Sequence, residues 1–134
     1  MGSPVEAASN VFESYAHLND PLLPVNHMSS TQIKLARWQA RNFGSATLQD
    51  LALGVCEEAG ELAHAVLKHL QGIRGLKDPQ IAKIKIADAL ADVCIYATQI
   101  ATLLRIDFGE NYIATVEQVL ERDWKTNQEN GENQ

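Results

Sequence analysis

The chain has 134 residues, of which 46 % are hydrophobic and only 6 % aromatic. That length suits one domain with its own core, and the abundance of Ala, Leu and Ile favours helices over a sheet sandwich. The 11 basic and 17 acidic residues give a net charge of −6, which argues against a broad nucleic-acid-binding surface.

Residues 1–28 form a leader-like or tag-like segment with weak periodicity, and we expect it to be poorly ordered. The His27-Met28 pair is either a cloning junction, with Met28 as the natural start, or part of a native segment. The segment has no basic stretch followed by an apolar run, so no signal peptide is predicted. With Cys56 and Cys94 expected as reduced core thiols, these features predict a cytoplasmic protein.

After the leader-like segment, the sequence predicts two helices separated by a short loop. One begins at a cap on Ser30 or Thr31 and ends at Gly44. After a short loop, Thr47 caps the second, with Asp50 three residues later in a capping-box position. This second helix carries apolar residues at helical spacing and ends at the glycines of the following loop.

The third predicted helix follows a cap on Asp78 and runs to about Arg105, with two Asp and one Gln in its apolar stretch from Ile86 to Leu104. Those polar residues favour the central helix of a soluble protein over a membrane span. A helix that is apolar on most of its circumference must be covered on all sides, so we infer a partner subunit. A fourth helix, from a cap on Asp107 to Trp124, has four residues expected to point inward: Tyr112, Val116, Val119 and Leu120.

These elements together predict an all-α fold of the four-helix-bundle type that assembles into a homo-oligomer. The helical domain is expected to span residues 29–125. Residues 126–134 contain no apolar side chain, so we expect a disordered polar tail there.

Five carboxylates interrupt the apolar pattern of the second and third helices. A carboxylate within packed helices costs much free energy unless it is protonated, paired with a base or bound to a metal ion. Too few bases lie close by along the chain to pair five acids. A shared cation is therefore predicted for these residues: Glu57, Glu58, Glu61, Asp88 and Asp92.

Residues three or four apart share a helix face. Glu57 and Glu58 therefore each align with Glu61 on the second helix. Asp88 and Asp92 form a matching pair on the third, and the two clusters meet at one level if the helices pack antiparallel. Carboxylate oxygens suit Mg²⁺ or Mn²⁺ far better than Zn²⁺. The alternative is a solvated acidic face, which the apolar surroundings of the second pair disfavour.

A second metal chemistry shares some of these residues. Glu61 and His64 have the Glu-x-x-His spacing of di-iron carboxylate bundles. That type of site needs a second such pair, and the region around Asp88 and Asp92 has no histidine. A di-iron centre is therefore the less favoured of the two metal sites.

Four segments resemble the MazG-like nucleotide pyrophosphohydrolases, in particular the short single-domain forms of phages and mobile elements. They are WQARNFG, GVCEEAGELAHAVLKHLQGIR, IADALADVCIYATQIA and VEQVLERDW, within residues 32–125. The resemblance implies an all-α NTP pyrophosphatase fold and a dimer or dimer of dimers. It also implies Mg²⁺-dependent hydrolysis of a (deoxy)nucleoside triphosphate to monophosphate and pyrophosphate, as in nucleotide-pool housecleaning.

On this resemblance, the family's glutamate triplet and second-motif aspartate fall on four residues: Glu57, Glu58, Glu61 and Asp92. Many relatives have Glu three residues before that Asp, where this chain has Ala89. Asp88, one position earlier, is the expected substitute. In the expected mechanism the acids hold Mg²⁺, or alternatively Mn²⁺, which positions a water for in-line attack on the triphosphate. The resemblance suggests Glu58 as the residue that orients or deprotonates this water, and spacing alone does not separate it from Glu57.

Three further residues are candidates for binding the substrate. Lys68 lies about two turns beyond Glu61 on the same face, and Arg74 follows in the loop, so both can reach phosphates. Trp38 is the candidate for stacking on the base, the alternative being a core anchor of the first helix. The rival function is a non-catalytic, homo-oligomeric module that binds a nucleotide or a partner, and Ala89 is the feature in its favour.

Overall fold

The computed structural model describes residues 29–129 and 131, and this part of the chain contains four α-helices and no strand. The helices are α2 (Ser30–Phe43), α3 (Leu48–Gln71), α4 (Pro79–Leu103) and α5 (Phe108–Leu120). The all-α prediction is therefore confirmed for the described residues. The leader-like segment predicted at residues 1–28 lies outside them.

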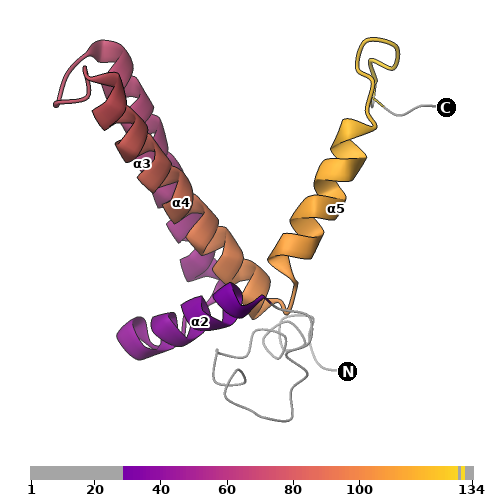
Figure 1. Cartoon of the computed structure of the whole chain (residues 1–134). Helices are drawn as coiled ribbons and strands as arrows, with labels where there is room; N and C mark the ends of the chain where they lie inside the picture. Colours follow the sequence, from indigo (N-terminus) through magenta and orange to yellow (C-terminus); the bar gives the residue numbers. More distant parts are fainter. Residues whose placement is uncertain (1–28, 130, 132–134) are drawn as a thin grey trace, which may run out of the picture.

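The two long helices, α3 and α4, lie side by side and form the main body of the molecule (Figure 1). The loop between them reverses the chain, so they are antiparallel, as the acidic spacing required. Helix α2 packs across the open end of this pair, and α5 leaves the same end at a wide angle (Figure 1). One copy of the described chain therefore does not close into a four-helix bundle.

Side-chain caps determine where the helices begin. Ser29 Oγ accepts a hydrogen bond from the Gln32 N–H (3.3 Å), so α2 is capped one residue earlier than predicted. Thr47 and Asp50 form the expected capping box, and their hydrogen bonds hold the pKa of Asp50 below its ordinary value. The caps of the last two helices are the predicted residues, Asp78 and Asp107.

A small cluster of buried apolar side chains lies where α2 meets the open end of the α3–α4 pair. It is formed by Ala36, Ala46, Leu51 and Leu103, with three partly buried neighbours: Leu48, Tyr96 and Ile100. Much apolar surface elsewhere stays exposed, including Ile84 of α4. The expectation that α4 is covered on all sides is therefore not met within one described copy.

A buried glutamine joins the beginnings of α2 and α5. Gln32 Nε2 donates to the Ile106 carbonyl oxygen (2.8 Å) and to Thr102 Oγ1 (3.3 Å). Gln32 Oε1 accepts from the backbone N–H of Phe108 (3.0 Å), the first residue of α5. The side chain is only 1 % exposed, and its amide satisfies polar groups of the α4–α5 connection. The sequence pattern did not single out Gln32, because a glutamine in an amphipathic helix is normally part of the polar face.

Helix α5 differs from its prediction in length and in burial. It ends at Leu120 and not at Trp124. Tyr112, Val119 and Leu120 were predicted to point inward, but they are exposed, and no residue of α5 is buried in the described structure. The reason is that α5 diverges from the α3–α4 pair, so no other described element covers its apolar face.

Both cysteines also differ from their prediction as core thiols. Cys56 and Cys94 are exposed and unbridged, on sides of α3 and α4 that no other described helix covers. Helix α4 is long and apolar enough, by length and composition alone, to cross a membrane. Core helices of soluble proteins meet the same criterion, so this property does not distinguish the two settings.

The segment after α5 is organised by Asp123. The hydroxyl and backbone N–H of Thr126 and the backbone N–H of Lys125 donate to its carboxylate and hold its pKa below the ordinary value. The Asp123 N–H in turn donates to the Gly131 carbonyl oxygen (2.8 Å). The described beginning of the predicted polar tail is thus part of a hydrogen-bonded turn. Residues 130 and 132–134 of that tail lie outside the described residues.

Candidate active site

The acidic clusters of α3 and α4 meet in one groove of the helix pair. A cavity of about 320 Å³ is lined by Glu58 and Glu61 from α3 and by Asp88 and Asp92 from α4. Glu58 and Asp92 are half-buried, whereas Glu61 and Asp88 are exposed. The clusters therefore face each other, but the expectation that these acids are buried is wrong for a single copy, because solvent reaches the groove.

Glu57 lies apart from the other four acids. It is exposed, and it lines neither this cavity nor the second one described below. Its charge is still close enough to influence the titration of Glu58. The fold thus separates two neighbouring glutamates that spacing alone left equivalent, since only Glu58 faces the groove.

Glu58 is the carboxyl group on which the negative charge of the groove converges. Desolvation raises the pKa of Glu58 above its ordinary value, and the charges of Asp92, Glu57 and Glu61 raise it further. A carboxylate with a raised pKa is a stronger base than an ordinary glutamate, which suits a residue that accepts a proton from water. The same crowding means that a cation placed here would be stabilised.

The donor set of this cavity fits a hard divalent cation, because its four acids all offer carboxylate oxygens. Within the described residues, no three His, Cys, Asp or Glu side chains converge closely enough to hold a metal ion by themselves. A cation here would therefore take part of its coordination from outside the chain. This is typical of Mg²⁺, which usually keeps several water ligands and binds substrate phosphates together with one or two carboxylates. His64 also lines the cavity.

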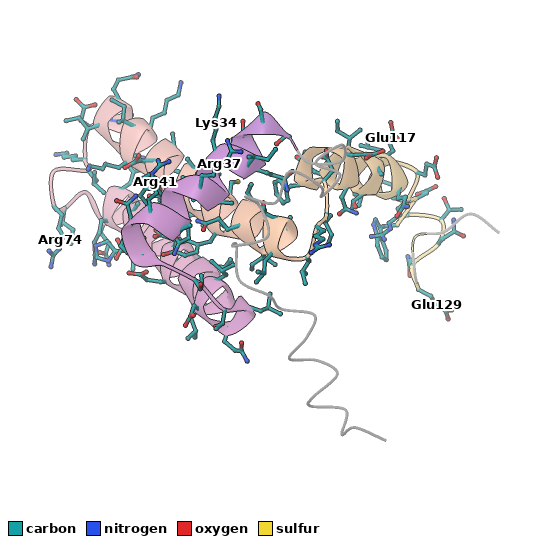
Figure 2. The ribbon with its side chains drawn as sticks, turned by 90° about the horizontal axis from the view of Figure 1, so that it is seen from below. Lys34, Arg37, Arg41, Arg74, Glu117 and Glu129 are labelled. Carbon is teal, nitrogen blue, oxygen red and sulfur yellow. The ribbon has the colours of Figure 1, made fainter. Side chains whose placement is uncertain are left out.

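Three basic side chains line the same cavity towards the α3–α4 loop: Lys68, Arg74 and Lys85. Lys68 and Arg74 are the two predicted phosphate-binding residues, and Figure 2 shows Arg74 on the loop itself. Lys68 Nζ donates a hydrogen bond to Gln71 Oε1 (2.9 Å). Lys85 escaped the sequence prediction, although it stands three residues before Asp88 and so shares its helix face.

A second cavity, of about 530 Å³, adjoins the first, because Glu58 and Asp92 line both. The rest of its lining is mostly apolar and aromatic, with Trp38 and Phe43 from α2 and Tyr96 from α4. The Trp38 and Phe43 rings meet edge to face, with centroids 5.5 Å apart and an angle of 71° between their planes. Trp38 is 44 % exposed, so it forms a wall of this cavity and not a core anchor.

Three kinds of lining therefore follow one another along the α3–α4 groove. Aromatic side chains lie at the open end, carboxylates in the middle and basic groups at the loop end. Lys85 and Asp92 are seven residues apart on α4, which corresponds to about 10 Å along the helix. This arrangement can hold an elongated ligand with a flat ring at one end, an anionic chain at the other and its reacting centre between them.

Comparisons of the chain with protein-family models, with curated proteins and with solved structures find no match. The functional argument below therefore rests on the geometry of the two adjoining cavities, together with the motifs quoted above.

Proposed function

We propose that this chain is a Mg²⁺-dependent nucleoside triphosphate pyrophosphohydrolase, which converts a (deoxy)nucleoside triphosphate to its monophosphate and pyrophosphate. The observation that carries the proposal is that an aromatic cavity and an acidic cavity share Glu58 and Asp92. The groove thus presents apolar rings, then carboxylates, then basic groups. A nucleoside triphosphate presents matching partners in the same order, namely a base, the α-phosphate and the outer phosphates.

The order of the lining also favours one bond of the triphosphate. The carboxylates lie next to the aromatic cavity, so the phosphorus nearest to them would be the α-phosphorus of a ligand whose base occupies that cavity. Lys68, Arg74 and Lys85 lie on the far side and would pair with the β- and γ-phosphates. A nucleotidase that removes only the terminal phosphate would need its acids at the loop end of the groove, where the γ-phosphate would lie.

In the proposed reaction, water attacks the α-phosphorus and the bond to the bridging oxygen of the β-phosphate breaks. Glu58 accepts the proton of the attacking water, because its raised pKa makes this carboxylate a better proton acceptor than an ordinary glutamate. Mg²⁺, when bound, neutralises charge on the phosphoryl oxygens, and the residues that would hold it are Glu58, Glu61, Asp88 and Asp92. The three basic side chains, Lys68, Arg74 and Lys85, stabilise the pyrophosphate as it leaves.

Trp38 and Tyr96 would hold the base in the aromatic cavity. Stacking on an aromatic ring contributes about 1–3 kcal/mol per base and depends little on which base is present. The exposed position of Trp38 leaves part of its ring accessible to a ligand.

The experiment is a panel of nucleoside and deoxynucleoside triphosphates with Mg²⁺, in which the products are identified. Monophosphate with pyrophosphate is expected, and only in the presence of the divalent ion. Diphosphate with phosphate would contradict the proposed order along the groove.

Substitution of the acids tests the site directly. Glu61→Ala and Asp92→Ala should each lower turnover roughly 100-fold or more, because a bound metal supplies several kcal/mol of transition-state stabilisation. Glu57→Ala is the matched control and should lose far less, since Glu57 lines neither cavity. Circular dichroism should show unchanged helicity in all three, and full activity of the first two would refute the acidic site.

A second candidate function is nucleotide binding without hydrolysis. It is supported by the lack of a three-ligand metal group within the described residues. Binding of nucleotides without turnover across the whole panel would favour this candidate over the hydrolase.

A further inference from the structure

Helix α5 carries an apolar face that nothing in the described chain covers. Tyr112, Ile113 and Leu120 are 62, 59 and 77 % exposed, and no α5 residue is buried. Burying a large apolar side chain contributes about 1.5–3 kcal/mol, so a helix that leaves several of them in water has a strong tendency to find a cover.

An acidic stripe borders this apolar face. Glu110, Glu117 and Glu121 are all exposed, and their spacing of seven and then four residues keeps them within about 40° of one another around the helix. Ile113 and Leu120 follow within about 80° on one side of the stripe. Helix α5 therefore presents negative charge and uncovered apolar surface side by side.

A basic stripe runs along α2, with an exposed aromatic ring beside it. Lys34, Arg37 and Arg41 are all exposed and lie within about 60° around the helix. Figure 2 shows the three along one edge of α2, which contains no acidic residue. Trp38 lies about 40° from Lys34 and is 44 % exposed. The α2 surface thus complements that of α5, with positive charge beside apolar surface.

The two surfaces are kept apart within one copy. The hydrogen bond from the Phe108 N–H to Gln32 Oε1 (3.0 Å) ties the first turn of α5 to the first turn of α2. From this point the helices diverge, as Figure 1 shows. Helix α5 therefore does not lie along the basic stripe of its own chain, although a second copy of the chain carries the same stripe.

We propose that α5 of each copy packs along α2 of a second copy, which forms a two-fold symmetric dimer with two equivalent contacts. Burial of the apolar faces supplies most of the free energy, and the opposite charges determine the register. Since Trp38, beside the basic stripe, is a wall of the aromatic cavity, α5 of the partner would border the ligand site. The proposal concerns assembly and does not depend on the hydrolase activity.

Charge reversal on each stripe tests the contact by sedimentation velocity. The unmodified chain should be a dimer. The variant with Arg37→Glu and Arg41→Glu, and the variant with Glu117→Arg and Glu121→Arg, should each have a dissociation constant raised on the order of 100-fold, since like charges then face each other. An equimolar mixture of the two variants should dimerise again, because both contacts of the mixed dimer regain opposite charges.

Controls separate this contact from unspecific effects of charge. Lys77→Glu with Lys83→Glu reverses two exposed cations away from α2 and should leave the dimer intact. Circular dichroism should show that all variants are helical. A monomeric unmodified chain, dimers that survive either reversal, or a mixture that stays monomeric would each overturn the proposal. None of these readouts requires turnover, so a failure of the dimer proposal is distinct from a failure of the proposed function.

Discussion

The ring of Tyr96 on α4 lies directly against the backbone of Gly54 on α3, and a Cβ atom at position 54 would overlap its ring carbons. Gly54 is buried, and Tyr96 is a wall of the aromatic cavity. The missing side chain therefore determines both how closely the two long helices approach and where the aromatic ring stands beside the acidic groove.

Substitution of this glycine should be harmful although alanine is the better helix former. Gly54→Ala forces the Tyr96 ring or the helix to move, so we expect a loss of about 1–3 kcal/mol in the free energy of unfolding and weaker nucleotide binding. Gly60→Ala is the matched control, because nothing lies within 4 Å of its added Cβ. That change should stabilise the protein by about 0.5–1 kcal/mol in urea unfolding. Equal effects of the two substitutions on stability would contradict the close approach of the Tyr96 ring to Gly54.

Loss of the Gln32 side chain should destabilise the junction of α2, α4 and α5. Gln32→Ala leaves the Ile106 carbonyl and the Phe108 N–H without their partner, so we expect a cost of about 2–4 kcal/mol. Gln49→Ala, an exposed glutamine of α3, should change stability by less than about 0.5 kcal/mol. Urea unfolding followed by circular dichroism measures both, and a similar small cost for both would mean that the buried network contributes little.

The raised pKa of Glu58 predicts a pH-dependent cost of its ionised form. Because the pKa is higher in the folded than in the unfolded chain, the cost is absent below the ordinary glutamate pKa of about 4.3 and develops as the pH rises through the folded value. Glu58→Gln should therefore have the higher melting temperature at neutral pH, and the difference should disappear below about pH 4. A constant difference across this range would show that the substitution acts through packing alone. Mg²⁺ at neutral pH should stabilise the unmodified protein more than the variant.

Lys85 should matter for substrate binding although no sequence pattern drew attention to it. Lys85→Ala should raise KM roughly 10-fold with little change in kcat, because a hydrogen bond to a charged phosphate contributes about 1.5–3 kcal/mol and part of this is lost to solvent. Lys83→Ala removes an exposed lysine of the same helix that lines neither cavity, and it should leave KM unchanged. Steady-state kinetics of the two variants make the comparison, and a rise of KM in both would point to a general charge effect.

Stacking on Trp38 should be visible as quenching of tryptophan fluorescence by a nucleotide. The chain has two tryptophans, and Trp124 lies beside Arg122, whose guanidinium carbon is 6.0 Å from the ring centroid, and away from both cavities. Quenching should therefore persist in Trp124→Phe and vanish in Trp38→Phe. If quenching persists in Trp38→Phe, Trp38 is excluded as the stacking ring.

The sequence by itself determined the helices and the facing of the two acidic clusters. The capping residues Thr47, Asp78 and Asp107 and the three- and four-residue spacing act within one or two turns, so local interactions are enough to specify them. The level at which Glu61 and Asp88 meet then follows from their distances to the connecting loop.

Only the tertiary structure decided which surfaces these helices cover and which they leave open. It turned Glu58 into the groove and Glu57 away from it, added Lys85 to the basic end, and assembled an aromatic cavity from α2 and α4. Within the described residues it also left α5 uncovered, which its amphipathic pattern did not indicate. The physical reason is that a pattern of apolar residues shows which face of a helix will be buried, whereas the crossing of neighbouring helices and a single buried side chain such as Gln32 decide what it is buried against.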